Sequence, residues 1–113
     1  MGIKDLKKGA RLYFLGIGGV SMSAIATILS ARGYTVAGYD RASSPATDAL
    51  REKGIDVSFD FDPAVLSAFD AVVYSAAFGS DHPVMKQTAA TGIPLISRAE
   101  MLGHVAEHHA NSV

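Results

Sequence analysis

The sequence contains no cysteine and no tryptophan among its 113 residues. The absence of cysteine excludes a disulfide framework, a thiolate zinc site and a cysteine nucleophile. Neither sign of charge predominates, since ten Lys and Arg stand against eleven Asp and Glu. The chain therefore offers no broad cationic surface to nucleic acid or to an anionic membrane. No apolar run approaches the roughly 20 residues of a membrane-spanning helix, so we expect a soluble domain without nucleic-acid or membrane partners. The absence of cysteine is compatible with a reducing cytoplasm, so we expect a cytoplasmic protein.

The composition is that of a folded domain. Hydrophobic residues make up 49% of the chain and charged residues 19%, which is typical of a globular protein and not of a disordered one. The length fits one domain, because domains typically span about 100–150 residues. No internal repeat, low-complexity segment or interdomain linker is visible. We predict a single domain over residues 1–113.

Short apolar runs alternate along the chain with segments of helical spacing. Strands are expected at residues 11–15, 34–39, 55–59, 71–74 and 93–96, and helices at 20–29, 46–53, 62–68, 83–91 and 98–109. Short connections between alternating strands and helices favour a parallel sheet that is covered on both faces. Right-handed crossovers and a glycine-rich first turn predict an α/β, Rossmann-like three-layer sandwich. Its five-stranded parallel sheet should have the order 3-2-1-4-5.

The loop between the first strand and the first helix has the sequence GIGGVSMS, residues 16–23. Gly16 allows a sharp turn after the strand, and Gly18 lets the backbone approach a ligand. The following helix directs unpaired N–H groups and its positive dipole end to the same place, which suits a phosphate. Ser21 and Ser23 either add hydroxyl donors or cap the helix. The candidate binding residues of this loop are Gly16, Gly18, Gly19, Val20, Ser21, Met22 and Ser23.

Asp40 ends the second predicted strand, about 20 residues after the glycine loop, where an acid commonly accepts hydrogen bonds from ribose hydroxyls. Ser21 replaces the third glycine of the usual G-x-G-x-x-G motif. The pattern is compatible with NAD, FAD or a UDP-sugar, and also with a tight turn followed by an exposed Asp. The sequence contains no G-x-x-x-x-G-K-[ST] motif, so we do not expect ATP hydrolysis by this chain.

Several segments together resemble the Mur ligases of bacterial peptidoglycan synthesis. They are FLGIGGVSMS at 14–23, GYTVAGYD at 33–40, SPAT at 44–47, SAA at 75–77 and GIPLISRAEML at 92–102. The resemblance covers nearly the whole chain. Members of this family have three domains, which hold the UDP-sugar, the ATP and the amino acid. By this resemblance, the chain corresponds to the first domain alone.

The resemblance implies a substrate and assigns residues to it. The ligand would be UDP-N-acetylmuramate or a related UDP-sugar, with residues 18–23 on the diphosphate and Asp40 on the uridine side. Ser75, Ala76 and Ala77 would line the same crevice. Arg98 would face the anionic ligand, although an ion pair with Glu100 or Glu107 is an equal alternative.

The resemblance also implies what this chain lacks. It should contain no catalytic residue, no metal and no cofactor, and it should be inactive alone. ATP and Mg²⁺ are expected only in the full-length enzyme, where the remaining ligase domains are partners in cis. Four residues differ from those usual in the family: Tyr39, Phe61, Ala76 and His82. By the resemblance, these differences concern the contacts to uridine and not those to the diphosphate. Phe61 either stacks on uracil or belongs to the core.

Other groupings favour structural roles. His104 and His108 have the i, i+4 spacing of metal ligands, but a solvated terminal helix explains them better. Asp60, Asp62 and Asp70 are interpreted as capping and solubilising residues. Ser75, Ser80 and His82 share one loop without a third orienting group, so a hydrolase is rejected. Two alternative functions stay open: an NAD(P)-binding module of a dehydrogenase and a non-catalytic nucleotide-sensing domain.

Overall fold

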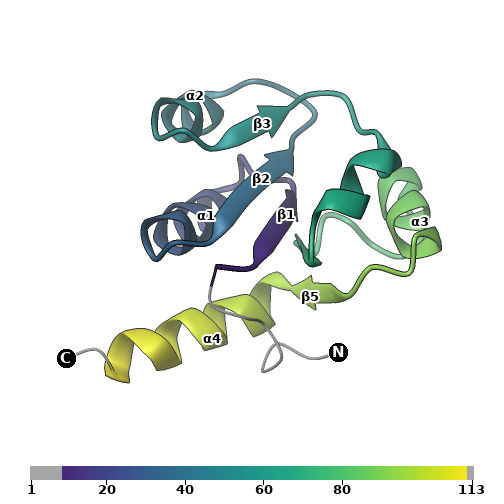
Figure 1. The fold of residues 1–113 in the computed structure, drawn as a ribbon. Coiled ribbons are helices and arrows are strands. Elements are labelled where there is room, and N and C mark those ends of the chain that lie inside the picture. The colour runs from purple at the N-terminus through teal and green to yellow at the C-terminus, as the bar shows by residue number, and fades with distance from the viewer. Residues whose placement is uncertain (1–8, 112–113) are drawn as a thin grey trace.

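The computed structural model describes residues 9–111, with side chains described for residues 9–105 (Figure 1). In chain order the elements are β1 (Arg11–Leu15), α1 (Val20–Ala31), β2 (Thr35–Tyr39), α2 (Pro45–Glu52), β3 (Asp56–Ser58), the 3-10 helix η2 (Pro63–Ala68), β4 (Ala71–Tyr74), α3 (Pro83–Ala90), β5 (Leu95–Ser97) and α4 (Arg98–Asn111). Strand and helix alternate as the hydrophobic periodicity predicts.

All five strands form one parallel sheet in the order β3-β2-β1-β4-β5. The predicted fold class and strand order are therefore confirmed. The chain moves outward from β1 through β2 to β3, and then crosses back to β4 on the other side of β1. The order reverses between β1 and β4, and open α/β sheets bind ligands at the carboxyl ends of the strands beside such a reversal.

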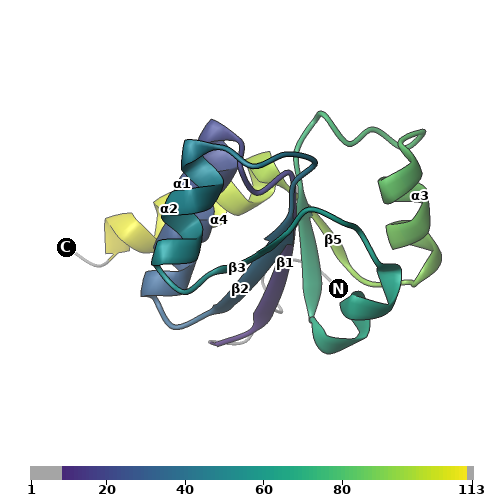
Figure 2. The same cartoon turned by 90° about the horizontal axis from the view of Figure 1, so that it is seen from above.

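Helices cover both faces of the sheet and create two cores. Figure 2 shows α1, α2 and α4 on one face and α3 on the other. Because side chains alternate along a strand, Leu12 and Phe14 of β1 enter the first core, whereas Tyr13 and Leu15 enter the second. The second core is closed by residues of η2 and α3: Leu66, Val84 and Met85.

Two elements differ from the predicted ones. The helix expected over 62–68 is a 3-10 helix that begins after Asp62, whose carboxylate accepts a hydrogen bond from the Ala64 N–H at 3.0 Å. Strand β5 begins at Leu95 and not at residue 93. Pro94 has no N–H to donate to the sheet, and the Ile93 N–H donates to the Thr91 hydroxyl at 3.3 Å. Both residues are thus kept out of the strand.

Within residues 9–111, no helix has the length and apolar character needed to span a membrane.

Candidate functional site

The carboxyl ends of four adjacent strands lie level with one another. Leu15 pairs with both Tyr39 and Tyr74, and Tyr74 pairs with Ser97. The next residue of each strand therefore lies at the same edge of the sheet. These residues are Asp40 after β2, Gly16 after β1, Ser75 after β4 and Arg98 after β5. Four candidate residues predicted from distant parts of the sequence are thus brought to one edge.

The β1–α1 loop directs most of its own N–H groups into the protein. The N–H groups of Gly16 and Ile17 donate to the Tyr39 carbonyl at 2.8 and 3.1 Å, and the Gly19 N–H donates to the Gly16 carbonyl at 3.1 Å. Gly16 has a φ of 79°, which favours glycine. These bonds join the loop to the end of β2.

Asp40 accepts hydrogen bonds from two loops. Its Oδ2 accepts from the Gly18 N–H at 2.8 Å, and its Oδ1 accepts from the Ala42 N–H at 3.3 Å. A Cβ on Gly18 would lie 2.6 Å from Asp40 Oδ2 and 2.9 Å from Thr47 Cγ2. Contacts inside the protein therefore already require glycine at position 18, independently of any ligand. The ribose contact of Asp40 stays a prediction.

The first turn of α1 is the part of this loop with available donors. Its N-cap is Gly19, which offers no side-chain hydrogen bond. The N–H groups of Val20, Ser21 and Met22 have no hydrogen-bond partner among the residues that the structure describes. Three unpaired donors at the positive end of a 12-residue helix are of the kind that binds anions in proteins, so this turn is the candidate anion site.

Side chains cap the first turns of two other helices. Ser44 forms a capping box with Thr47 at the start of α2, and the His82 Nδ1 accepts from the Val84 N–H at the start of α3. In α1, the Ser23 hydroxyl donates to the Val20 carbonyl at 3.2 Å and accepts from none of the N–H groups of the first turn. Ser21 is exposed. The question of whether these two serines cap the helix is thereby answered: neither does.

Side chains at the start of α1 contribute unequally to the surface. Val20 is 92% exposed, whereas Met22 is only 2% exposed. Met22 can therefore contact a ligand only through its backbone. An apolar side chain as exposed as Val20 lies at the rim of the anion site without packing against the protein.

The loop that follows β4 touches the glycine loop. The Phe78 N–H donates to the Ser75 carbonyl at 2.9 Å, which closes a turn in which Ala76 and Ala77 are exposed. A Cβ on Gly16 would lie 2.8 Å from Phe78 Cε1 and 3.6 Å from Ser75 Oγ. The structure thus brings the predicted Ser75 segment to the glycine loop.

A row of aromatic rings packs beneath these loops, and no pattern in the sequence predicted it. Tyr39 meets Phe61 and Phe78 edge to face, with ring centroids 5.8 and 6.4 Å apart, and Phe78 lies 4.7 Å from the His82 ring. Phe61, Tyr39 and Phe78 are half-buried and pack against the second core. Of the two predicted roles of Phe61, the structure shows packing against the core.

Arg98 is half-buried at the start of α4. It makes no hydrogen bond or ion pair with any residue that the structure describes. Glu100 instead accepts from the N–H and the hydroxyl of Ser97, at 3.3 and 3.1 Å. The alternative ion pair with Glu100 is therefore absent, and the side chain of Glu107 lies outside the described residues.

Two of the acidic residues interpreted as structural accept hydrogen bonds from backbone N–H groups. Asp62 caps η2, and the Asp70 Oδ2 accepts from the Arg11 N–H at 2.8 Å. The described residues contain no group of three or more His, Asp or Glu side chains that could hold a metal ion. The side chain of His108 lies outside this part.

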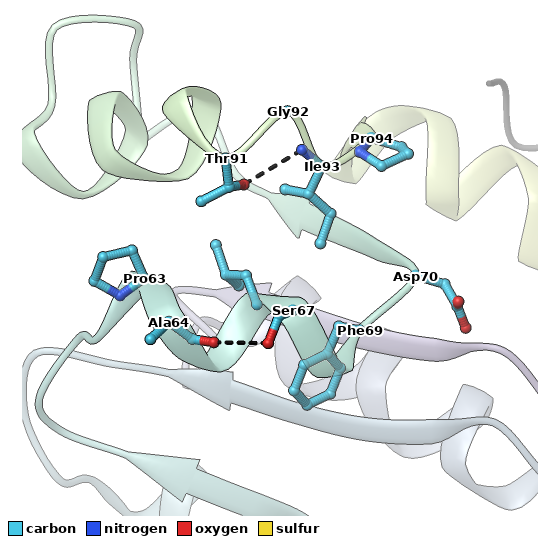
Figure 3. A pocket seen from close by; sticks show the side chains of 10 residues that line it. Pro63, Ala64, Ser67, Phe69, Asp70, Thr91, Gly92, Ile93 and Pro94 are labelled. Atoms are coloured by element: carbon cyan, nitrogen blue, oxygen red, sulfur yellow. Dashed lines mark hydrogen bonds between the residues drawn. The ribbon is translucent and has the colours of Figure 1, made fainter.

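A surface depression of about 460 Å³ lies away from the glycine loop (Figure 3). It separates η2 from the turn before β5, at the amino edge of β4 and β5. The hydroxyls of Ser67 and Thr91 in its wall bond to the Ala64 carbonyl and the Ile93 N–H. Both hydroxyls that line the depression are therefore already hydrogen-bonded within the protein. The carboxyl edge of the sheet is the better candidate site.

Burial raises the pKa of Tyr13 to about 12, and the nearby Asp56, Tyr39 and Asp62 add to the shift. Tyr13 lies in the middle of β1, where it pairs with Ala37 and Val72. The shift therefore reflects the second core and not the carboxyl edge.

A model of the Mur ligase family, catalytic domain, matches residues 11–110. Curated relatives named UDP-N-acetylmuramate–L-alanine ligase include a protein of Agathobacter rectalis, which is 37% identical over 96% of this chain and 24% of its own length. Another, of Porphyromonas gingivalis, is 43% identical over 84% of this chain and 22% of its own length. The chain thus spans less than a quarter of the length of these two relatives.

Solved structures agree on the fold. The chain is similar to UDP-N-acetylmuramate–alanine ligase from Thermotoga maritima, with a TM-score of 0.79 and 24% identity over 88% of this chain and 23% of that one. At that identity the likeness concerns the fold alone. The family match, which extends over nearly the whole described chain, concerns the sequence. This chain belongs to the Mur ligase family.

Proposed function

We propose that this chain binds UDP-N-acetylmuramate as the substrate domain of a UDP-N-acetylmuramate–L-alanine ligase in peptidoglycan synthesis. The diphosphate would bind the first turn of α1, and the uridine would extend towards the loop after β2. The observation that carries the proposal is the uncapped first turn of α1, with three unpaired N–H groups, in a chain whose curated relatives are named for that substrate.

The charges at the carboxyl edge support an anionic ligand. Arg98 follows β5 and has no partner in the described part of the chain. Arg41 is exposed directly after Asp40. Arginine forms strong charge-assisted hydrogen bonds with phosphate oxygens. We assign Arg98 to the diphosphate side of the ligand, together with the first turn of α1.

The bond-forming reaction would need parts of the enzyme other than this chain. In the complete ligase, ATP would phosphorylate the lactyl carboxylate of UDP-N-acetylmuramate. The amine of L-alanine would then displace phosphate and form the amide. We expect other parts of the ligase to bind ATP and Mg²⁺. The sequence contains no G-x-x-x-x-G-K-[ST] motif, and the described residues contain no group of three or more His, Asp or Glu side chains that could hold a metal ion. We propose that this chain alone is inactive, and that it works in the cytoplasm beside the other ligase domains.

Isothermal titration calorimetry of the purified chain with UDP-N-acetylmuramate, UDP and NADH tests the proposal. We expect the two uridine ligands to bind and NADH not to bind. Binding of NADH alone would select the dehydrogenase-type alternative, and binding of none of the three would contradict the proposed function.

Arg98→Gln provides a site-directed version of the same test. It should weaken UDP-N-acetylmuramate binding roughly 10- to 150-fold, because a charge-assisted hydrogen bond contributes roughly 1.5–3 kcal/mol. Arg32→Gln is the matched control, since Arg32 follows the C-terminal end of α1 at the opposite edge of the sheet. Equal effects of the two substitutions would show a nonspecific loss of positive charge.

Gly18 is not a suitable position for this test. A side chain there collides with Asp40 and Thr47 in the protein itself, so lost binding by a Gly18 variant would not distinguish a blocked ligand from a distorted loop.

A further inference from the structure

The carboxylate of Asp40 is the only described side chain that joins the β1–α1 loop to the β2–α2 loop by hydrogen bonds. It accepts from the Gly18 N–H in the first loop and from the Ala42 N–H in the second. The Asp40 N–H itself donates to the Ser58 carbonyl at 3.0 Å, which fixes its backbone to the end of β3. The backbone of Asp40 is therefore hydrogen-bonded to β3, while its carboxylate is hydrogen-bonded to Gly18.

The loop has few other means of holding its shape at this point. Gly18 and Gly19 have no side chains, and glycine has the largest conformational freedom of any residue. The Gly18 N–H is only partly exposed, and a donor that loses its partner without full access to water destabilises the conformation that holds it. Removing the Asp40 acceptor should therefore let this segment move.

Movement at Gly18 reaches the anion site directly. Gly19 is the N-cap of α1, and the unpaired donors begin at Val20. The direction of these donors thus depends on how the chain enters the helix. A negative charge beside a diphosphate costs binding energy by repulsion, so a carboxylate at this place needs a compensating role.

We propose, on the basis of the function proposed above, that Asp40 is a positioning residue for the diphosphate. It holds Gly18 and so fixes the first turn of α1 in the orientation that binds the phosphates, and its effect on affinity passes through the loop and not through the ribose. The hydrogen bond from Gly18 to Asp40 joins two parts of the protein itself, so it would preorganise the anion site.

The two roles of Asp40 predict different responses to ligand fragments. A positioning residue affects every ligand that carries the diphosphate, with or without a ribose. A ribose-binding residue affects only ligands that contain the ribose. Inorganic pyrophosphate and UDP therefore separate the two roles.

The experiment compares the wild type, Asp40→Ala and Asp40→Asn by NMR and calorimetry. Without ligand, we expect hydrogen exchange of the Gly18 amide to be accelerated in Asp40→Ala. Asp40→Asn should keep most of the protection, because its side-chain oxygen can still accept from Gly18. With ligand, Asp40→Ala should weaken binding of UDP and of pyrophosphate by the same factor, at least about tenfold, and Asp40→Asn should restore most of the affinity for both.

Asp70→Ala is the matched control. It removes a carboxylate that accepts from a backbone N–H at the same distance, 2.8 Å, but at the amino edge of the sheet. It should leave both ligand affinities and the Gly18 amide unchanged.

Two results would overturn the inference. A loss of UDP affinity with unchanged pyrophosphate affinity would show that Asp40 contacts the ribose. Unchanged exchange of the Gly18 amide in Asp40→Ala would show that Asp40 does not hold the loop. If the wild type bound neither UDP nor pyrophosphate, the proposed function itself would fail, and the inference with it. The first two results leave that function intact.

Discussion

Replacing Val20 with Asp should change stability and affinity in opposite directions. Val20 is the first residue of α1 and is 92% exposed, so its loss removes almost no packing. The first turn of α1 contains no acidic residue. A carboxylate there interacts favourably with the helix dipole and should stabilise the protein by about 0.3–1 kcal/mol, or about 1–6 °C in melting temperature.

The same carboxylate should repel the diphosphate. At a separation of about 5 Å, two like charges cost about 1 kcal/mol in water and about 3 kcal/mol near a protein surface. This corresponds to roughly 5- to 150-fold weaker binding of UDP-N-acetylmuramate. The factor should shrink as the ionic strength rises, because salt screens exposed charges.

Val20→Asn is the control, since Asn matches Asp in shape but carries no charge. Calorimetric titrations of both variants at low and high salt give the four affinities that are needed, and thermal melts of each variant give the change in stability. Equal affinities of the Asp and Asn variants at low salt would refute the location of the diphosphate at α1.

Three further predictions concern the fold. A Cβ on Gly38 would lie 2.7 Å from the Phe14 carbonyl oxygen, so Gly38→Ala should lower the free energy of unfolding in urea by about 1–3 kcal/mol. Gly79→Ala, with open space around it, should change it far less. The wild type should lose stability between pH 10 and 12, because Tyr13 with its raised pKa keeps its proton in the folded state while the unfolded chain releases it. Tyr13→Phe should remove that part of the pH dependence in denaturation series, and an unchanged slope would contradict the assignment.

The secondary structure was predictable because the local signals agree with one another. Apolar runs such as residues 11–15 are bounded by glycines. Helix α3 begins at Pro83 as predicted, and α2 begins at Pro45, one residue before the predicted start. The start of β5 was the exception, because the prediction followed hydrophobicity and passed over Pro94. The helix over 63–68 was predicted in place but not in type, since its six residues form only 3-10 turns.

The position of the glycine loop was also predictable from the sequence, but the contacts that its residues make were not. The motif predicts a phosphate site at residues 16–23, and the first turn of α1 within it has unpaired N–H donors. Phosphate binding itself stays a prediction. From the sequence, we expected Gly18 to let the backbone approach a ligand closely. The structure shows that Asp40 and Thr47 already fill the space beside Gly18. The aromatic row around Tyr39 had no sequence signal, because Phe61 and Phe78 lie in separate loops.

The sequence by itself determined the strands, the helices, their order and the place of the glycine loop between β1 and α1. These depend on hydrophobic period, glycine and proline positions, and the right-handed crossover, which act over short stretches of chain. Only the tertiary structure decided which groups meet at the carboxyl edge. Gly18 and Asp40 are 22 residues apart in sequence, and they become partners because β1 and β2 pair in one particular register. That register is set by the packing of whole faces of the sheet, which no short stretch of sequence encodes.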